Sequence, residues 1–250
     1  MGIEKAFDNL SEEILKPWEI YEKIDGFPEV AVATFHHDTI DIINDRPDAE
    51  KISEFQAGFT ISIYAVTHKS KKIAVYQTLI GGAGSAGILE HMIAKGAKKF
   101  LFFGSCGTLD KNISVGNFII PTEAYRDEGT SYHYMPASDY IEVKTADKLA
   151  EIMTELNLPH VKGKTWTTDA IYRETRNNML KRKNEGCLTV EMECASVMAA
   201  GQFREVDVYQ YLYAEDNLDS DEWERRSMGS VALSTKEKYL MIALDIASMI

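Results

Sequence analysis

The chain has 250 residues, 45% of them hydrophobic, which is enough to bury one substantial core in a single domain over residues 1–250. A net charge of −12 disfavours a nucleic-acid partner, because nucleic-acid binders carry a basic face. The three cysteines, Cys106, Cys187 and Cys194, include no C-x-x-C pair, which argues against a disulfide framework or a metal site.

No part of the sequence predicts a membrane partner. The first ten residues, MGIEKAFDNL, contain no apolar signal core, and Ala6 breaks the N-myristoylation pattern. No run approaches the ~18 apolar residues that a membrane span requires. We therefore expect a cytoplasmic protein that acts on small molecules.

Short runs rich in β-branched and aromatic residues predict seven strands. They cover residues 29–35, 60–68, 73–79, 99–104, 116–122, 164–168 and 206–214. The second and third flank KSKK, which predicts a hairpin, whereas the polar stretch 44–51 is expected to be a loop.

Helical patterns alternate with these strands. Apolar residues recur at helical spacing in two places: Ile88, Leu89, Met92 and Ile93, and Leu149, Ile152, Met153 and Leu156. A capping box from Ser234 to Glu237 is expected to begin the last helix. The alternation predicts an α/β fold with a mostly parallel sheet.

A glycine loop follows the third predicted strand. Gly82, Gly84 and Gly87 have the G-x-G-x-x-G spacing of dinucleotide-binding loops. Such loops also need an acidic residue roughly twenty positions on, to hold the ribose hydroxyls. Residues 99–108 contain no acid, so NAD binding is disfavoured. The remaining alternatives are a tight strand-to-helix turn and a turn that lines a different ligand site.

The sequence after this loop resembles the nucleoside phosphorylase family, which includes purine nucleoside and uridine phosphorylases and related nucleosidases. Several segments carry the resemblance in family order: GSCG at 104–107, SVGNFIIPTEAYRDEG at 114–129, TTDAIYRET at 167–175, TVEMECAS at 189–196, which matches V-E-M-E-x-A, and LYAEDN at 212–217, where purine-specific members carry Ser-Asp. In this family the glycine loop lies beside the active site and binds no dinucleotide.

The resemblance implies both a fold and an activity. The fold is a single α/β domain with a central mixed, partly barrel-like sheet flanked by helices. The activity is phosphorolysis of a nucleoside, with a purine favoured, to the free base and ribose 1-phosphate. Phosphate is then a co-substrate, and no further cofactor or metal is expected. The family also implies a homodimer or a dimer-based hexamer.

The resemblance assigns the sugar contacts to the V-E-M-E segment. Glu193 is expected to accept hydrogen bonds from the ribose 2′- and 3′-hydroxyls, and Met192 to pack on the sugar. Glu191 is the third substrate-binding candidate of this motif. The alternative is that Glu191 and Glu193 are only first-turn acids favoured by a helix dipole.

The base contacts are assigned to two other segments. Asp216 is the candidate catalytic acid that protonates the departing base, because a carboxyl after an apolar strand can have a raised pKa. Arg225 is expected to assist it, although Arg226 is equally placed. Tyr172 is the base-pocket candidate. The alternative for the acids of residues 215–224 is that they are solvated loop charges.

Three residues after the fourth predicted strand are candidates for an anion-binding turn. The amides of Ser105, Cys106 and Gly107 can form a small nest for an anion. Cys106 is expected to be a small buried residue rather than a nucleophile. Gly84 and His36 complete the expected substrate-binding set.

The phosphate-binding arginines of the family are absent from their expected positions. Phe102 or Phe103 replaces one, and the early loop TFHHDTID, residues 34–41, supplies no other. Candidate replacements are His36, His37, Arg46, Arg126, His133, Arg173 and Arg176. Two alternatives therefore stay open: a hydrolase, with Asp38 or a histidine as the base that activates water, and a nucleoside-binding protein without turnover.

Overall fold

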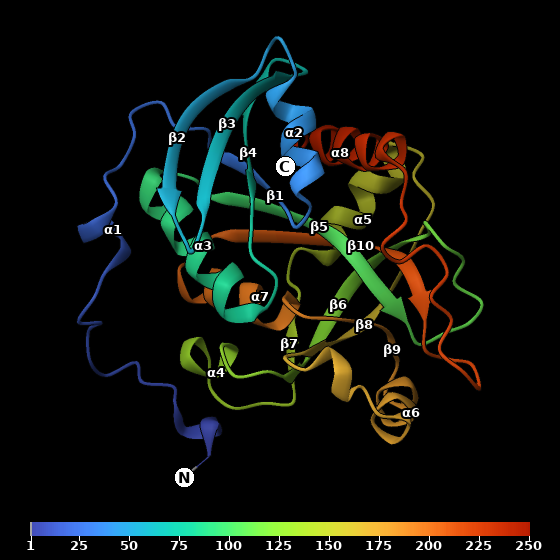
Figure 1. The fold of residues 1–250 in the computed structure, drawn as a ribbon. Helices are drawn as coiled ribbons and strands as arrows, with labels where there is room; N and C mark the ends of the chain where they lie inside the picture. The colour runs from blue at the N-terminus through green and yellow to red at the C-terminus, as the bar shows by residue number, and fades with distance from the viewer. Residues whose placement is uncertain (1) are drawn as a thin grey trace.

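The strands join into one mixed sheet, part of which closes into a barrel (Figure 1). The computed structural model describes residues 2–250. Its strands are β1 (Val30–Thr34), β2 (Glu50–Gln56), β3 (Thr60–His68), β4 (Lys71–Gln77), β5 (Lys99–Thr108), β6 (Phe118–Asp127), β7 (Tyr140–Glu142), β8 (His160–Thr168), β9 (Cys187–Glu191) and β10 (Asp207–Asn217).

The barrel consists of β10, β6, β8, β9 and β5, which pair in that order before β10 returns to pair with β5. The outer strands β1, β4, β3 and β2 extend the sheet from β5. The expected mixed, partly barrel-like α/β fold is therefore confirmed. The expectation of a mostly parallel sheet is wrong, because half of the strand pairings are antiparallel.

The predicted hairpin is formed by β3 and β4, which pair antiparallel from Ile63↔Tyr76 to His68↔Lys71. Lys69 and Ser70 turn the chain with φ of 48° and 66°, the left-handed backbone that tight hairpin turns require. The stretch 44–51 is not entirely a loop, since β2 begins at Glu50 and pairs with β3. Its half-exposed, polar side chains explain why no strand was predicted there.

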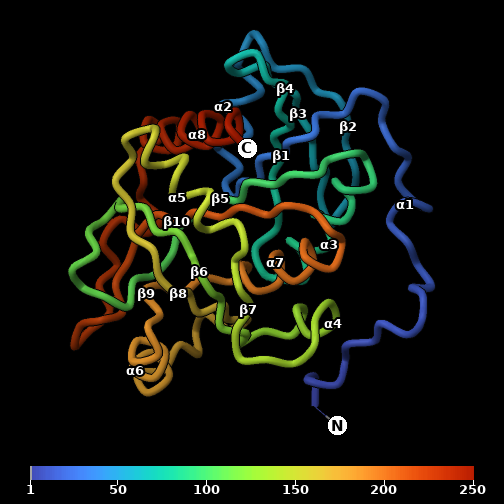
Figure 2. The backbone as a smooth tube through the Cα atoms, turned by 180° about the vertical axis from the view of Figure 1, so that it is seen from behind, coloured from blue at the N-terminus to red at the C-terminus, as the bar shows by residue number. Residues whose placement is uncertain are grey.

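Two groups of helices cover the sheet (Figure 2). The α-helices are α1 (Pro17–Ile20), α2 (His37–Asn44), α3 (Gly82–Lys95), α4 (Ser131–Tyr134), α5 (Ala146–Glu155), α6 (Arg176–Asn184), α7 (Cys194–Phe203) and α8 (Leu233–Ala247). Helices α3 and α4 pack on α7, whereas α2 and α5 pack on α8. The predicted capping box is wrong: α8 already begins at Leu233, after Ala232, and has no side-chain cap.

The parallel strands β1, β5 and β10 bring their carboxyl ends together at one edge of the sheet. In α/β sheets this edge is where ligands bind, because the loops that leave the strands diverge there. The residues that leave β1 are Phe35 and His36, and those at the ends of β5 and β10 are 105–107 and 215–216. This edge is the natural place for a functional site.

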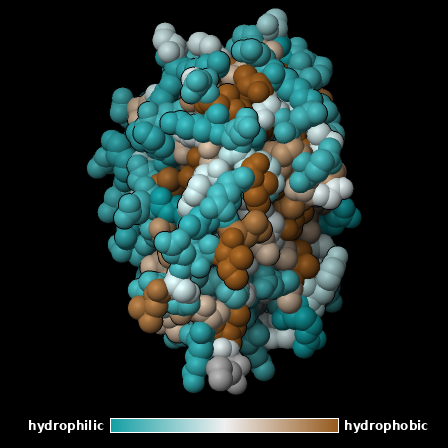
Figure 3. Space-filling model, turned by 90° about the vertical axis from the view of Figure 1, so that its left-hand side faces the viewer, coloured by the Kyte–Doolittle hydropathy of each residue, from teal (hydrophilic) through white to brown (hydrophobic). Residues whose placement is uncertain are grey.

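The face that carries α1 has exposed apolar side chains among polar ones (Figure 3). Those of the segment before β1 are Ile3, Leu10, Ile14, Leu15, Trp18 and Ile20. Across residues 2–250, no helix combines the length and apolar character needed to cross a bilayer. The same residues contain no cluster of three His, Cys, Asp or Glu side chains placed to hold a metal ion.

Candidate active site

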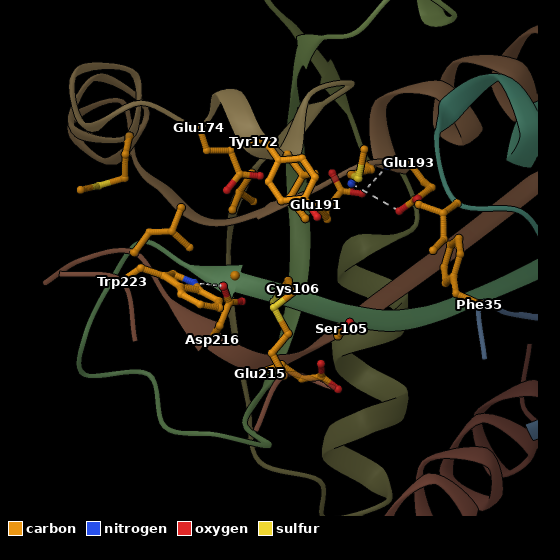
Figure 4. Close-up of a pocket in the computed structure, with 18 of the residues that line it drawn as sticks. Phe35, Ser105, Cys106, Tyr172, Glu174, Glu191, Glu193, Glu215, Asp216 and Trp223 are labelled. Carbon is orange, nitrogen blue, oxygen red and sulfur yellow. Dashed lines mark hydrogen bonds between the residues drawn. The ribbon is translucent and has the colours of Figure 1, made fainter. Parts of the chain in front are cut away.

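A cavity of about 730 Å³ opens at the carboxyl ends of β1, β5 and β10, within the size range of small-molecule sites. Residues 190–193, at the junction of β9 and α7, line its other side, together with the short helix η2 (Ile171–Arg173). Figure 4 shows Glu191, Glu193 and Tyr172 on one side and Ser105, Cys106, Glu215 and Asp216 on the other. Most of the expected site residues therefore share one cavity.

Glu191 and Glu193 are both buried, but they differ in their hydrogen-bond partners. One oxygen of Glu191 accepts from the Thr167 hydroxyl at 2.5 Å, and the other accepts from the amides of Glu193 at 2.8 Å and Cys194 at 2.6 Å. Glu191 therefore holds the backbone at the start of α7, although it precedes the helix and is not the first-turn acid of the alternative considered for it. Its carboxylate keeps little capacity to bind a substrate.

Glu193 retains an oxygen for a ligand. Its Oε1 accepts from the Gly81 amide at 2.7 Å, whereas Oε2 has only a 3.3 Å contact with the Met192 amide. Burial raises the pKa of both Glu191 and Glu193, and the charge of Glu191 adds to the rise at Glu193. The three donors around Glu191 stabilise its charged form, whereas Glu193 has fewer donors.

The glycine loop positions Glu193 through its backbone. Gly81 has φ of +93° and ψ of 146°, a conformation essentially reserved for glycine, and this conformation directs its amide to Glu193. Gly82 and Gly84 serve packing, since an added Cβ would lie 2.1 Å from the Ser196 hydroxyl and 2.7 Å from Leu79 Cβ. The expected contact of Gly84 with substrate is not seen, because Gly84 faces Leu79 and does not line the cavity.

Asp216 lies on the opposite side of the cavity from Glu193, at the end of β10 (Figure 4). The Trp223 indole donates to its Oδ2 at 2.7 Å, and Gly107 leaves room for its Oδ1. Burial raises the pKa of Asp216, and the Trp223 bond and the charge of Arg226 oppose that rise. A partly buried carboxyl of this kind can donate a proton to a ligand.

Glu174 lies near Asp216 at the same end of the cavity. Burial, reinforced by the charge of Asp216, raises the pKa of Glu174 to about 7. Tyr172 is 95% exposed and lies at the rim. This end therefore combines two acids, one of them half protonated near neutral pH, with two aromatic side chains.

Ser105, Cys106, Gly107 and His36 all line the cavity, as expected. The expected anion-binding turn is wrong, because residues 105–107 belong to strand β5 and pair with β10. Cys106 is buried and its thiol contacts the Tyr213 carbonyl at 3.6 Å. Burial raises the pKa of this thiol well above its usual value, which disfavours the thiolate that a nucleophile would need. His36 shares a hydrogen bond of 2.9 Å with the Tyr213 hydroxyl.

Arg225 does not reach the cavity. Its side chain is exposed and donates to the Met228 carbonyl at 3.0 Å. Arg226, the equally placed alternative, donates to the Ile113 carbonyl at 2.8 Å and acts on Asp216 only through its charge.

The titratable acidic and basic side chains that line the cavity are predominantly acidic. Within residues 2–250 they include one arginine, Arg176, and one histidine, His36, against five carboxylates: Glu174, Glu191, Glu193, Glu215 and Asp216. Arg176 donates to the Asp221 carbonyl at 2.6 Å. The other candidate phosphate ligands lie elsewhere: Arg126 is buried among Ser131, Pro136 and Ser138, and Arg46 pairs with Asp48.

The lining residues that were not predicted as site residues are mostly apolar, but they include three that can form side-chain hydrogen bonds: Glu174, Glu215 and Trp223. Glu174 follows Tyr172 by two positions, within the segment already assigned to the base. Trp223 was visible as an isolated aromatic residue in the acidic stretch 219–224. Glu215 adjoins Asp216, but strand alternation would have turned it away from the cavity.

The sequence of the chain is similar to those of known proteins. A family model described as the phosphorylase superfamily matches residues 29–244. The DeoD-type purine nucleoside phosphorylase of an Exiguobacterium species is 25% identical over 185 residues, which are 72% of this chain and 77% of that protein. A DeoD-type enzyme of Bacillus cereus is 27% identical over 186 residues, with the same coverage.

Two further proteins resemble the chain. An uncharacterised protein of Acanthamoeba polyphaga mimivirus is 28% identical over 150 residues, which span 60% of this chain and 59% of the viral protein. The crystal structure of a purine nucleoside phosphorylase from Toxoplasma gondii, in complex with immucillin-H, superposes with a TM-score of 0.75. It is 20% identical and covers 96% of this chain and 98% of that one, so it shows a shared fold.

Proposed function

Because the chain belongs to the phosphorylase superfamily, we propose that it cleaves the N-glycosidic bond of a nucleoside, with a purine as the favoured base. The purine preference is supported by the names of the DeoD-type relatives and by two acids beside an indole at one end of the cavity. The observation that carries the proposal is the position of Glu193 opposite Asp216 across one cavity.

The two acids supply what glycosidic cleavage requires. As the bond breaks, positive charge develops on the sugar and negative charge on the departing base. Glu193 Oε2 can accept hydrogen bonds from the sugar hydroxyls and fix the sugar in the cavity. Asp216 can donate a proton or a hydrogen bond to the departing base, provided that its carboxyl is protonated.

The names of the relatives favour phosphate as the acceptor of the sugar. The charge of the cavity favours a second candidate, hydrolysis by water. Five carboxylates against one arginine and one histidine, counted over residues 2–250, oppose the binding of a phosphate dianion. Each charge-assisted hydrogen bond that such an anion lacks costs about 1.5–3 kcal/mol.

The test is release of free base from inosine, guanosine, adenosine, methylthioadenosine and uridine, followed by chromatography with and without phosphate. We expect release from at least one purine nucleoside and a much slower reaction with Asp216→Asn. Binding of these nucleosides without release, measured by calorimetry, would instead support a nucleoside-binding protein.

We also propose that the chain forms at least a dimer, as its resemblance to oligomeric phosphorylases implies. The exposed apolar side chains of the segment before β1, including Leu10 and Ile14, are available for a subunit contact. Light scattering coupled to size exclusion tests this: a monomeric mass at all concentrations would contradict it.

A further inference from the structure

Glu215 occupies an irregular position in β10. Ala214 pairs with Cys106 and Asp216 pairs with Gly107, which leaves Glu215 as an extra residue between the two pairs. Neighbouring residues of a regular strand point to opposite faces, whereas a bulge redirects them. As a result, both Glu215 and Asp216 line the cavity.

The main chain holds this bulge in place. The amide of Ser227 donates to the Glu215 carbonyl at 3.0 Å, and the Ser227 hydroxyl approaches the same carbonyl at 3.3 Å. The segment after β10 therefore fixes the position from which the Glu215 side chain enters the cavity.

The Glu215 carboxylate lies beside Ser105 of β5, in the segment that the sequence assigned to an anion. Ser105 lies next to Glu215 in Figure 4, and its hydroxyl interacts favourably with the charged carboxylate. Lys236 of α8 stabilises the same charge, although this lysine also pairs with Asp38. Ser105 and Lys236, two groups able to bind an external anion, thus already stabilise the Glu215 carboxylate.

We propose that Glu215 is the general base that activates water in this cavity, and that its carboxylate takes the place of an external phosphate. This inference rests on the proposed cleavage of a nucleoside. It assigns water as the acceptor and gives Glu215 and Asp216, neighbours in the chain, opposite roles in one reaction.

The reaction balances without a further reactant. Glu215 accepts a proton from water as the water oxygen forms a bond to the sugar C1′. The C1′–N bond breaks, and its electron pair goes to the base, which receives a proton from Asp216. The products are the free base and the free sugar, and solvent returns each acid to its starting state.

The surroundings of Glu215 suit a base near neutral pH. Burial, followed by the charge of Asp216, raises the pKa of Glu215 to about 6, while Lys236 and the Ser105 hydroxyl oppose the rise. Tyr213 on β10 and Tyr239 on α8 also face Glu215. His36, just before α2, and Asp38, in the first turn of α2, interact with Lys236. Because a base acts in its deprotonated form, kcat is expected to rise with pH through about 6.

The experiment compares wild type with Glu215→Gln and Glu215→Ala on the best purine nucleoside, with and without phosphate, and identifies the sugar product. We expect wild type to release free ribose at a rate independent of phosphate. Glu215→Gln should lower kcat about 100-fold and abolish the rise of kcat with pH, with little change in KM. Formate, a small external base, should restore part of the rate to Glu215→Ala.

Two controls separate a structural effect from a chemical one. Glu142→Gln, an exposed acid of β7 outside the cavity, should keep the wild-type rate. Glu215→Gln should unfold at the wild-type temperature or above it, since it removes a buried charge.

The outcomes distinguish this inference from the proposed function. Phosphate-dependent formation of ribose 1-phosphate, with Glu215→Gln as fast as wild type, would overturn the inference and leave nucleoside cleavage standing. A slow Glu215→Gln together with a Glu215→Ala that formate does not restore would also overturn the role of general base. Failure of wild type to release base from any nucleoside would overturn the proposed function itself.

Discussion

Two pairs of acids enter the same cavity, and their surroundings differ. Glu191 and Glu193 lie where β9 meets α7, and most of the groups that donate hydrogen bonds to their carboxylates are backbone amides. Glu215 and Asp216 lie on a bulge of β10, and their donors are side chains: Ser105 for one and Trp223 for the other. Through Glu193, the first pair is suited to holding a ligand in place, whereas the second is suited to exchanging protons with it.

Within the first pair, the number of hydrogen-bond donors distinguishes a carboxylate with a structural role from one that remains free to bind a ligand. Glu191 accepts three hydrogen bonds and closes the start of α7, whereas Glu193 accepts one short bond and one long contact. A shared motif therefore does not imply a shared role. The substitutions below test this assignment, in order of decreasing effect.

The largest effect is expected for Glu193→Ala. This change removes the carboxylate proposed to accept two sugar hydroxyls, which is worth about 3 kcal/mol or more and corresponds to about a 100-fold fall in kcat/KM. Steady-state kinetics on a purine nucleoside would measure it. A fall of less than about threefold would show that Glu193 does not hold the sugar.

Asp216→Asn comes next, with kcat expected to fall about 100-fold because the departing base loses its proton donor. The loss should largely disappear for a 7-methylpurine nucleoside, whose base leaves without needing that proton. If both substrates suffer equally, Asp216 has a structural role.

Gly81→Ala should have an intermediate effect on both folding and binding. A side chain at this backbone conformation costs about 1–3 kcal/mol, and relief of the strain would move the amide away from Glu193 and raise KM. Gly87→Ala is the matched control, because Gly87 lies in α3 with open space around it and is expected to be neutral or stabilising. Equal denaturation midpoints and KM values for the two variants would contradict this account.

Thr167→Val should affect stability more than chemistry. Its hydroxyl donates to Glu191 and accepts from the Ala195 amide at 3.0 Å, so its loss should lower the free energy of unfolding by about 1.5 kcal/mol. Urea denaturation would measure the change. A large fall in kcat with unchanged stability would instead make Glu191 part of the catalytic machinery.

The smallest effect is expected for Trp223→Phe, which removes the indole donor to Asp216. That bond lowers the pKa of Asp216, so its loss raises the pKa further. If Asp216 acts as an acid, the alkaline limb of the pH–rate profile should move to higher pH with a change in rate of only a few fold. A shift to lower pH would contradict the assignment.

Much of the site could be predicted because its chemistry lies in short, ordered segments. The V-E-M-E and G-S-C-G motifs identified Glu193 and Ser105, and the apolar run before residue 215 identified the strand that carries Asp216. The strands β7 and β9 were missed because they are short. Strand register is set by pairing with distant segments, so the bulge at Glu215 left no signal in the sequence.

The choice between phosphate and water as the acceptor also depends on tertiary structure. Family order favoured phosphate, while the phenylalanines at 102 and 103 argued against an arginine in the anion site. Only the assembled cavity brings Glu215 beside Ser105 and shows how many carboxylates surround the ligand space. The balance of charge in a site depends on tertiary structure, because its acidic and basic members come from four separate segments: 36, 174–176, 191–193 and 215–216.

The most direct test of the two-pair account is the rate of base release from a purine nucleoside across a phosphate titration, with the sugar product identified at each point. The account predicts a rate independent of phosphate and free ribose throughout. A rate that is zero without phosphate and rises with it, with ribose 1-phosphate as the product, would contradict the role assigned to Glu215.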